Sequence, residues 1–88
     1  MDLRDLKLFL HLADSRHFGR TAQAVHVSPS TLSRQIQRLE DELGQPLFLR
    51  DNRDVRLTSA GEQLKTFAQQ TLLQYQQLRN ALGQTGPA

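Results

Sequence analysis

Cysteine is absent from the sequence, and aromatic residues are few. The 88 residues include no Cys and no Trp, with one Tyr and four Phe. The lack of cysteine excludes disulfide bonds, thiolate metal sites and cysteine catalysis. It is also typical of proteins of the reducing cytoplasm, where we expect this protein to act. No apolar run approaches the roughly 20 residues that cross a bilayer, and no signal-peptide pattern opens the chain, so we expect no membrane partner.

Patterns for catalysis and for metal binding are also missing. His11, His17 and His26 form no i, i+4 pair and have no acidic cluster beside them, so surface or packing roles are favoured over a metal site. The serines of residues 28–33 have no histidine base at a recognisable spacing, and no Gly-x-Ser-x-Gly sequence occurs. We expect this chain to be neither an enzyme nor a carrier of a metal or cofactor.

Acidic residues are missing from a long central stretch. No acid lies between Asp14 and Glu40, whereas four arginines do: Arg16, Arg20, Arg34 and Arg38. A second arginine cluster follows: Arg50, Arg53 and Arg56. Arginine forms paired hydrogen bonds with phosphates and with guanine edges. A solvated cationic surface explains the charge alone equally well, so charge does not decide between the two.

The first part of the chain predicts two helices. A helix over residues 2–14 has Asp2 as its cap and Asp5 in its first turn, and its apolar positions recur at helical spacing: Leu3, Leu6, Phe9, Leu10 and Ala13. A shorter helix over residues 18–26 turns its apolar residues inward: Phe18, Ala22 and Val25. A tight turn at His26 and Val27 leads into the next helix.

The segment "SPSTLSRQIQRLEDELGQP", residues 28–46, predicts a third helix. Ser28 supplies the cap and Pro29 suits the first helical position, while Gly44 and Pro46 mark the end. At roughly 100° per residue the apolar residues share one face, which we expect in the core: Leu32, Ile36, Leu39 and Leu43. The opposite face is polar and basic.

A small hairpin and a long helix follow. The segment "LFLRDNRDVRLT", residues 47–58, predicts two short strands with a turn at residues 51–53. The long helix begins with Thr58 or Ser59 as rival caps, the second in a capping box with Glu62, and runs to about Leu82. Its seam residues step by four and three alternately, as in a heptad repeat: Leu64, Ala68, Thr71, Tyr75, Leu78 and Leu82.

The length of this last helix favours a homodimer. A helix of about 25 residues would span roughly 37 Å, which is more than a three-helix core can cover. We expect the seam from Thr71 to Leu82 to pair with a second copy of the chain. The proximal part, including Leu64 and Phe67, should pack on its own domain.

Two short helices joined by a tight turn, the second of them basic on one face, predict a helix-turn-helix. The second helix would enter the major groove of DNA amino end first, because its free N–H groups favour phosphate. The acids at its far end then point away from the DNA: Glu40, Asp41 and Glu42. The hairpin would supply a wing with Arg53 at its tip, placed for a minor groove or a phosphate. The alternative is a winged helix that docks on another protein without contacting DNA, although the acid-free face argues against it.

The segment "HFGRTAQAVHVSPSTLSRQIQRLEDELGQPLFLRDNRDVRLTSAGE" resembles the amino-terminal domain of the LysR-type bacterial transcription regulators. The resemblance implies a mainly α fold: a winged helix-turn-helix with a small β-hairpin wing and a long C-terminal dimerisation helix. It also implies three parts: 1–58 as the DNA-binding domain, 59–82 as the linker and dimerisation helix, and 83–88 as the start of a hinge. The effector-binding domain of the family is absent from this sequence.

The same resemblance implies what the protein binds. The expected partners are double-stranded DNA with an interrupted palindromic operator, a second copy in a homodimer, further copies in a full-length tetramer, and RNA polymerase. No cofactor is expected in this fragment, because a small-molecule effector would bind the absent C-terminal domain. Within the family, "SRHFGRTAQAVHVSPSTLSRQIQRLE" and "LLQYQQLR" are most similar to regulators of branched-chain amino acid biosynthesis, which implies control of that pathway.

The expected interfaces follow from the helix-turn-helix and from the seam. The residues expected at DNA are Arg20, Ser28, Pro29, Ser30, Thr31, Ser33, Arg34, Gln37, Arg38, Arg50 and Arg53. The six seam residues named above form the expected dimer interface. The sequence departs from the family at Pro29-Ser30, where Gln-Pro is frequent, so a common base-reading Gln is missing. It also departs at His17, where a serine often caps the second helix.

Overall fold

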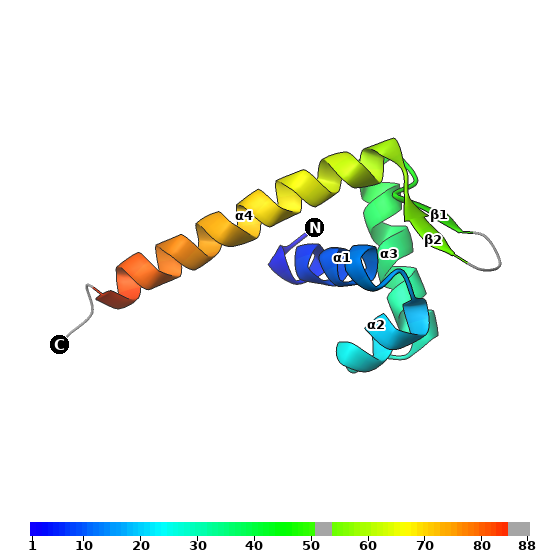
Figure 1. Ribbon diagram of the computed structural model, residues 1–88, viewed down its shortest axis with the longest axis horizontal. Coiled ribbons are helices and arrows are strands. Elements are labelled where there is room, and N and C mark those ends of the chain that lie inside the picture. Colours follow the sequence, from blue (N-terminus) through cyan, green and yellow to red (C-terminus); the bar gives the residue numbers. More distant parts are fainter. Residues whose placement is uncertain (51–53, 85–88) are drawn as a thin grey trace.

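The computed structural model describes residues 1–50 and 54–84 of the chain. Its elements are, in chain order, α1 (Leu3–Ser15), α2 (Phe18–Ala24), α3 (Pro29–Leu43), β1 (Phe48–Arg50), β2 (Val55–Leu57) and α4 (Ser59–Gln84). The two strands pair antiparallel, with Phe48 opposite Leu57 and Arg50 opposite Val55. The first three helices and the strands form a body, and α4 leaves this body as a long arm (Figure 1). This arrangement confirms the mainly α winged helix that the sequence predicts.

Local side-chain chemistry sets the ends of α1 and α3. Asp2 and Asp5 form a reciprocal capping box, in which each backbone N–H donates to the other carboxylate at 3.0 and 2.9 Å. Ser28 Oγ accepts the Thr31 N–H at 3.1 Å. Gly44 ends α3 in the left-handed conformation, with φ 71°, which glycine adopts without strain. The predicted caps of these two helices and the glycine stop are confirmed.

Helix α2 is shorter than the sequence predicts. It ends at Ala24 because His26 takes a left-handed conformation, with φ 61°, that a right-handed helix cannot continue. At the other end His17 is the cap, and its Nδ1 accepts the Arg20 N–H at 3.0 Å. A ring nitrogen thus does the work of the serine oxygen expected at this position.

Thr58 begins the long helix α4. Its Oγ1 accepts the Gly61 N–H at 3.0 Å, so of the two rival caps Thr58 is the one in the structure, and Ser59 is the first helical residue. Gly61 is required here, because a Cβ at this position would lie 2.2 Å from the carbonyl oxygen of Leu47. This close approach holds the first turn of α4 against the segment that enters β1.

The core lies where α1, α3 and β1 meet. Its largest fully buried apolar side chains come from these elements and from the residue before β1: Phe9, Leu12, Leu32, Ile36 and Leu47. The rings of Phe9 and Phe48 pack with centroids 5.3 Å apart. Leu43 was predicted in this core but is 41% exposed, because it lies one turn beyond Leu39, the last residue of α3 that reaches the core.

The buried face of α1 differs from its predicted pattern. Leu8 and Leu12 are buried, whereas Leu3, Leu10 and Ala13 only line the edge of the core. Helix α1 contacts α2, α3 and α4. Its core residues therefore come from more than one helical stripe, which a single 3.6-residue pattern does not describe.

The heptad seam of α4 is divided between two environments. Leu64 and Ala68 are buried in the core of their own chain, and Leu72 packs against that core. Their expected place in a dimer interface is therefore wrong, because a partner cannot reach them. Phe67, which was expected to pack on the domain, is half exposed, because the row Leu64–Ala68–Leu72 faces the body and Phe67 lies beside it.

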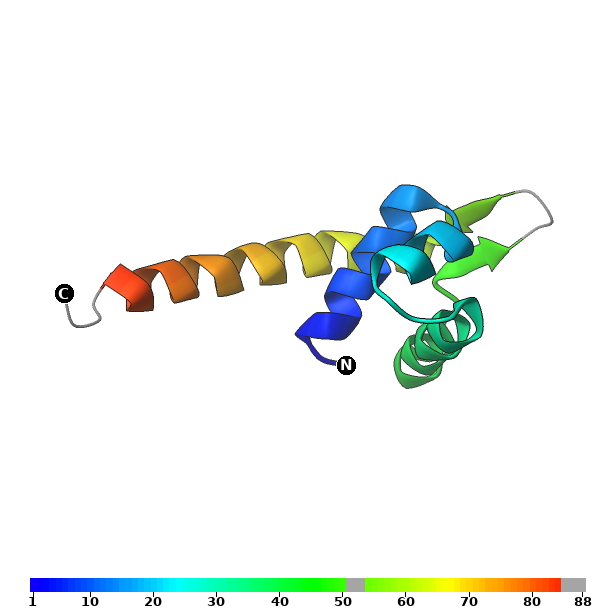
Figure 2. The ribbon, with the colours of Figure 1, turned by 90° about the horizontal axis from the view of Figure 1, so that it is seen from below.

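Beyond Leu72 the apolar residues of the seam are exposed. Tyr75, Leu78 and Leu82 are all exposed, the last to 61%. Both ribbon views show the arm projecting clear of the body (Figures 1 and 2). Within residues 1–50 and 54–84 no helix, α4 included, is both long and apolar enough to span a membrane.

Candidate nucleic-acid interface

The polar face of α3 is available to a partner. Helix α3 lies at the lower rim of the body in Figure 2, with the strands of the wing beside it. Its core face holds Leu32, Ile36 and Leu39, so the opposite face points outward. Ser30 and Arg34 on that outward face are exposed. The amino end of α3 therefore presents short hydroxyl side chains and a cation next to free backbone N–H groups, which favour an anion.

A hydroxyl cluster surrounds the first turn of α3. Ser28 Oγ, which caps the helix, also donates to Thr31 Oγ1 at 2.9 Å and lies 3.1 Å from Ser30 Oγ. Thr31 is half-buried, whereas Ser30 and Pro29 are exposed. Of these predicted contacts, Ser30 and Pro29 are best placed to touch another molecule, while Ser28 and Thr31 mainly order the turn.

Three of the predicted arginines have no acidic partner among residues 1–50 and 54–84. Arg20 on α2 and Arg34 and Arg38 on α3 are exposed. None of them forms an ion pair with any residue in the part of the chain that the structure describes. Their full positive charge therefore faces solvent, and it lies on the two helices of the helix-turn-helix.

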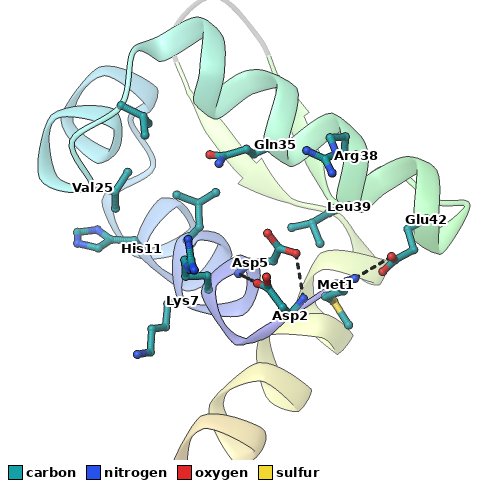
Figure 3. Close-up of a pocket in the computed structure, with 13 residues that line it drawn as sticks. Met1, Asp2, Asp5, Lys7, His11, Val25, Gln35, Arg38, Leu39 and Glu42 are labelled. Atoms are coloured by element: carbon teal, nitrogen blue, oxygen red, sulfur yellow. Dashed lines mark hydrogen bonds and ion pairs between the residues drawn. The ribbon is translucent and has the colours of Figure 1, made fainter.

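Arg38 borders a groove between α3 and the first half of α1. The groove has a volume of about 740 Å³, and Gln35, Arg38 and Glu42 project from α3 along one wall of it (Figure 3). Glu42 is paired with the amino terminus of Met1 at 2.8 Å, and this hydrogen bond raises the pKa of the terminal amine. The acid at the far end of α3 is thus turned toward the start of α1.

Gln37 and Asp41 are linked along the outer face of α3. The Gln37 amide donates to the Asp41 carboxylate at 3.0 Å, one helical turn further on. This bond holds the Gln37 side chain toward the carboxyl end of the helix, away from the exposed hydroxyls at its start. Arg53, the predicted tip of the wing, lies outside the described residues.

Arg16 is a structural residue that the sequence pattern grouped with the free cations. Its guanidinium donates to the Asp54 carboxylate at 2.6 Å and to the Val55 carbonyl at 3.2 Å. The hydrogen bond from Arg56, together with the charge of Arg16, lowers the pKa of Asp54, so this carboxylate stays ionised at neutral pH. The cluster ties the end of α1 to the start of β2.

Glu40 and Arg50 also turn out to be bound within the chain. The Glu40 carboxylate accepts the Leu47 N–H at 2.7 Å, and the Arg50 guanidinium lies 3.6 Å from the same carboxylate. From the sequence, Arg50 is expected at DNA and Glu40 among the acids that point away from DNA. Their contact has no sequence signal, because no periodic pattern indicates a contact between a helix and a strand that begins eight residues later.

The described residues contain no group of three or more His, Asp or Glu side chains that could hold a metal ion. The predicted DNA contacts that are exposed on α2, at the cap of α3 and in the first half of α3 are Arg20, Ser28, Pro29, Ser30 and Arg34. The arrangement offers cations and hydroxyls to an extended anion.

Comparisons with known proteins agree with this geometry. Residues 3–62 match the family described as bacterial regulatory helix-turn-helix protein, lysR family. The chain is 78% identical over all 88 residues to the HTH-type transcriptional activator IlvY of Salmonella typhimurium, and covers 30% of that protein. It is 77% identical over 88 residues to the regulator IlvY of Escherichia coli K12, again covering 30%. The chain thus spans about a third of the length of these curated relatives.

Solved structures show the same likeness. The complex of BenM_DBD with benA site 1 DNA matches with a TM-score of 0.93 at 31% identity, over 100% of this chain and 99% of that one. The complex of CbnR_DBD with DNA matches with a TM-score of 0.91 at 30% identity, over 99% of this chain and 100% of that one.

Proposed function

This chain belongs to the LysR family of bacterial regulatory helix-turn-helix proteins, and from that premise we propose that it binds double-stranded DNA sequence-specifically as part of a homodimeric transcription activator. One observation carries the proposal: α2 and α3 expose three arginines that form no ion pair within the described residues, and the first turn of α3 exposes short hydroxyl side chains. The solved neighbours bound to DNA support it further. They favour it over the alternative of a winged helix that docks only on proteins.

The arginines and the hydroxyls have different tasks in this proposal. Arg20, Arg34 and Arg38 neutralise phosphates, which fixes the position of the domain on any duplex. Ser30 and the ring of Pro29 meet base edges or a thymine methyl in the major groove, because they are exposed at the leading end of α3, whereas the exposed Ser28 hydroxyl is engaged in capping the helix. Sequence preference therefore depends on the first turn of α3, and overall affinity depends on the arginines.

The distal half of α4 forms the homodimer in this proposal. Tyr75, Leu78 and Leu82 are exposed on the arm, and Phe67 and Thr71 extend the same face toward the body. A second copy of the chain would cover these side chains, since a continuous row of exposed apolar side chains along one helix face marks an interface. Two-fold pairing then presents two recognition helices, and the site becomes an interrupted palindrome with half-sites about one helical turn apart.

The remaining expectations concern the longer protein. The likeness to the IlvY activators supports control of branched-chain amino acid biosynthesis, as the sequence resemblance implies. A small-molecule effector would bind outside the 88 residues. Tetramer formation, contact with RNA polymerase and action in the cytoplasm belong to the same proposal.

Selection of bound sites from random duplex DNA tests the function directly. We expect the chain to enrich an interrupted palindrome, and to bind the enriched duplex at least about a thousandfold more tightly than a scrambled one. Recovery of no common sequence, together with binding that does not respond to salt, would support the protein-docking alternative instead.

A further inference from the structure

Strand β1 is fastened to α3 at both of its ends. At its start, one Glu40 carboxylate oxygen accepts the Leu47 N–H at 2.7 Å and lies 3.4 Å from the Phe48 N–H. At its end, Arg50 reaches back toward the same Glu40 carboxylate, at 3.6 Å. One acid of α3 therefore contacts both the beginning and the end of the first wing strand.

The Arg50 guanidinium joins three elements at once. Its Cζ lies 4.9 Å from the centroid of the Phe18 ring in α2. Its Nη1 lies 3.5 Å from Ser33 Oγ in the first half of α3, and its Nη2 faces Glu40 about two turns further along that helix. The Arg50 side chain thus contacts the amino end of α2 and two successive parts of α3 from the base of the wing.

We propose that Arg50, with Glu40 and Phe18, is a positioning residue that sets the angle of the wing against the recognition helix, and that it does not serve as a phosphate contact. This inference rests on the proposed DNA binding. A planar guanidinium can stack on a ring with its face while its edge donates hydrogen bonds, whereas an ammonium group cannot do both. The geometry therefore requires arginine itself rather than positive charge.

The charge balance of the pair agrees with this role. The Glu40 side chain is only 11% exposed, and it sits against Arg50. A phosphate approaching Arg50 would meet a pair whose formal charges cancel, so the pair contributes little to counterion release. Arg20, Arg34 and Arg38 have no such acid among the described residues, so they remain the phosphate contacts.

The orientation of the wing should affect sequence reading more than general affinity. A small rotation between wing and α3 moves the base-contacting side chains out of alignment with the groove. Phosphate contacts tolerate such a shift, because flexible cationic side chains follow the backbone charge. Loss of the contacts among Arg50, Glu40 and Phe18 should therefore lower the ratio of the affinity for the operator to the affinity for a scrambled duplex.

The test compares conservative variants in titrations of two duplexes, the selected operator and a scrambled sequence, over a range of salt concentrations. Arg50→Lys keeps the positive charge but removes the planar guanidinium that lies against the Phe18 ring. We expect it to weaken binding to the operator about tenfold, which is the discrimination that one well-aligned base contact provides. The affinity for the scrambled duplex and the slope of log affinity against log salt should stay unchanged. Arg38→Lys is the matched control, since Arg38 is exposed and unpaired in the described chain, and it should change both affinities by the same factor.

A second variant separates positioning from simple electrostatics. Glu40→Gln removes an acid from a DNA-binding domain, so electrostatics alone predicts tighter binding to every duplex. We expect operator binding to fall while scrambled binding stays equal or rises. Proton spectra of the free chain add a reading independent of DNA: the Phe18 ring should shift the Arg50 δ-protons upfield, and Phe18→Leu should abolish the shift.

The outcomes separate the two proposals. If the unmodified chain binds no duplex, the proposed function fails, whatever the proton spectra show about the contact between Arg50 and Phe18. If the chain binds DNA but Arg50→Lys retains full operator affinity, or lowers both affinities and flattens the salt slope, the positioning role is overturned while the function stands. Melting curves show whether Arg50→Lys or Glu40→Gln is merely unfolded. The variant that stays folded then tests the positioning role.

Discussion

The two halves of α4 have the same apolar spacing but opposite surroundings. In the proximal half Leu64 and Ala68 are sealed into the core of their own chain, while in the distal half Leu78 and Leu82 are exposed. Their glycines differ in the same way: Gly61 fits tightly against the Leu47 carbonyl, whereas a Cβ at Gly83 would meet nothing within 4 Å. A heptad seam therefore predicts that apolar residues will be covered, but not by which surface.

A charge introduced into the proximal half of α4 should disrupt folding, whereas a charge in the distal half should disrupt dimerisation. Ala68 has no exposed surface, so Ala68→Asp would bury a carboxylate without a partner. We expect a loss on the order of 5 kcal/mol, comparable to the whole stability of a small domain. Circular dichroism should show that the chain no longer unfolds cooperatively. Retention of a cooperative transition near that of the unmodified chain would mean that the proximal half is not part of the core.

The same charge in the distal half should leave the body folded. Leu78 is 54% exposed in the single chain, so Leu78→Asp costs the monomer little but places a charge in the proposed dimer interface. We expect the dissociation constant of the dimer to rise at least about a hundredfold, or about 2.7 kcal/mol. Sedimentation velocity measures this. A fragment that sediments as a monomer even without the substitution would show that the seam lacks its proposed partner.

The glycines offer a matched pair of smaller changes. Gly61→Ala forces the Leu47 carbonyl to move, since the new Cβ would lie 2.2 Å away, and we expect a loss of about 2 kcal/mol from overpacking. Gly83→Ala adds a methyl group to open space near the end of α4 and should stabilise the helix by a few tenths of a kcal/mol, roughly, because alanine is the better helix former. Chemical denaturation compares the two. Equal effects would contradict the close approach at Gly61.

A small effect on the folding of the single chain is expected at Phe67. Its half exposure predicts that Phe67→Ala changes the monomer by less than about 1 kcal/mol, much less than the usual cost of truncating a buried Phe. Measured in the Leu78→Asp background, where no dimer forms, this change isolates the monomer. A loss of 3 kcal/mol or more, roughly the cost at a buried ring, would place Phe67 in the core as the sequence analysis expected.

Local chemistry explains which parts of the fold the sequence could predict. Caps such as Asp2 and Ser28 and the stop at Gly44 act within a few residues, so their signals are complete in a short window. The choice between Thr58 and Ser59 was left open, because both residues fit the cap pattern and only the approach of Leu47 to Gly61 decides it.

Contacts between distant elements explain the errors. Leu43 satisfies the helical pattern of α3 but lies past the end of the body. Arg16 and Arg50 count as free cations in the sequence, yet each is bound by an acid far along the chain, Asp54 and Glu40 respectively. The candidate interface was therefore predicted in outline, while the division of its arginines into structural and available ones required the fold.

The central claim is that two copies of this domain, joined through the distal half of α4, bind one DNA site together. The direct measurement is the salt dependence of operator binding by the unmodified chain and by Leu78→Asp. Because each copy neutralises its own phosphates, and each phosphate adds about 0.9 to the slope of log affinity against log salt, we expect the variant to show about half the slope and a much weaker affinity. Equal slopes and equal affinities for the two proteins would contradict the account.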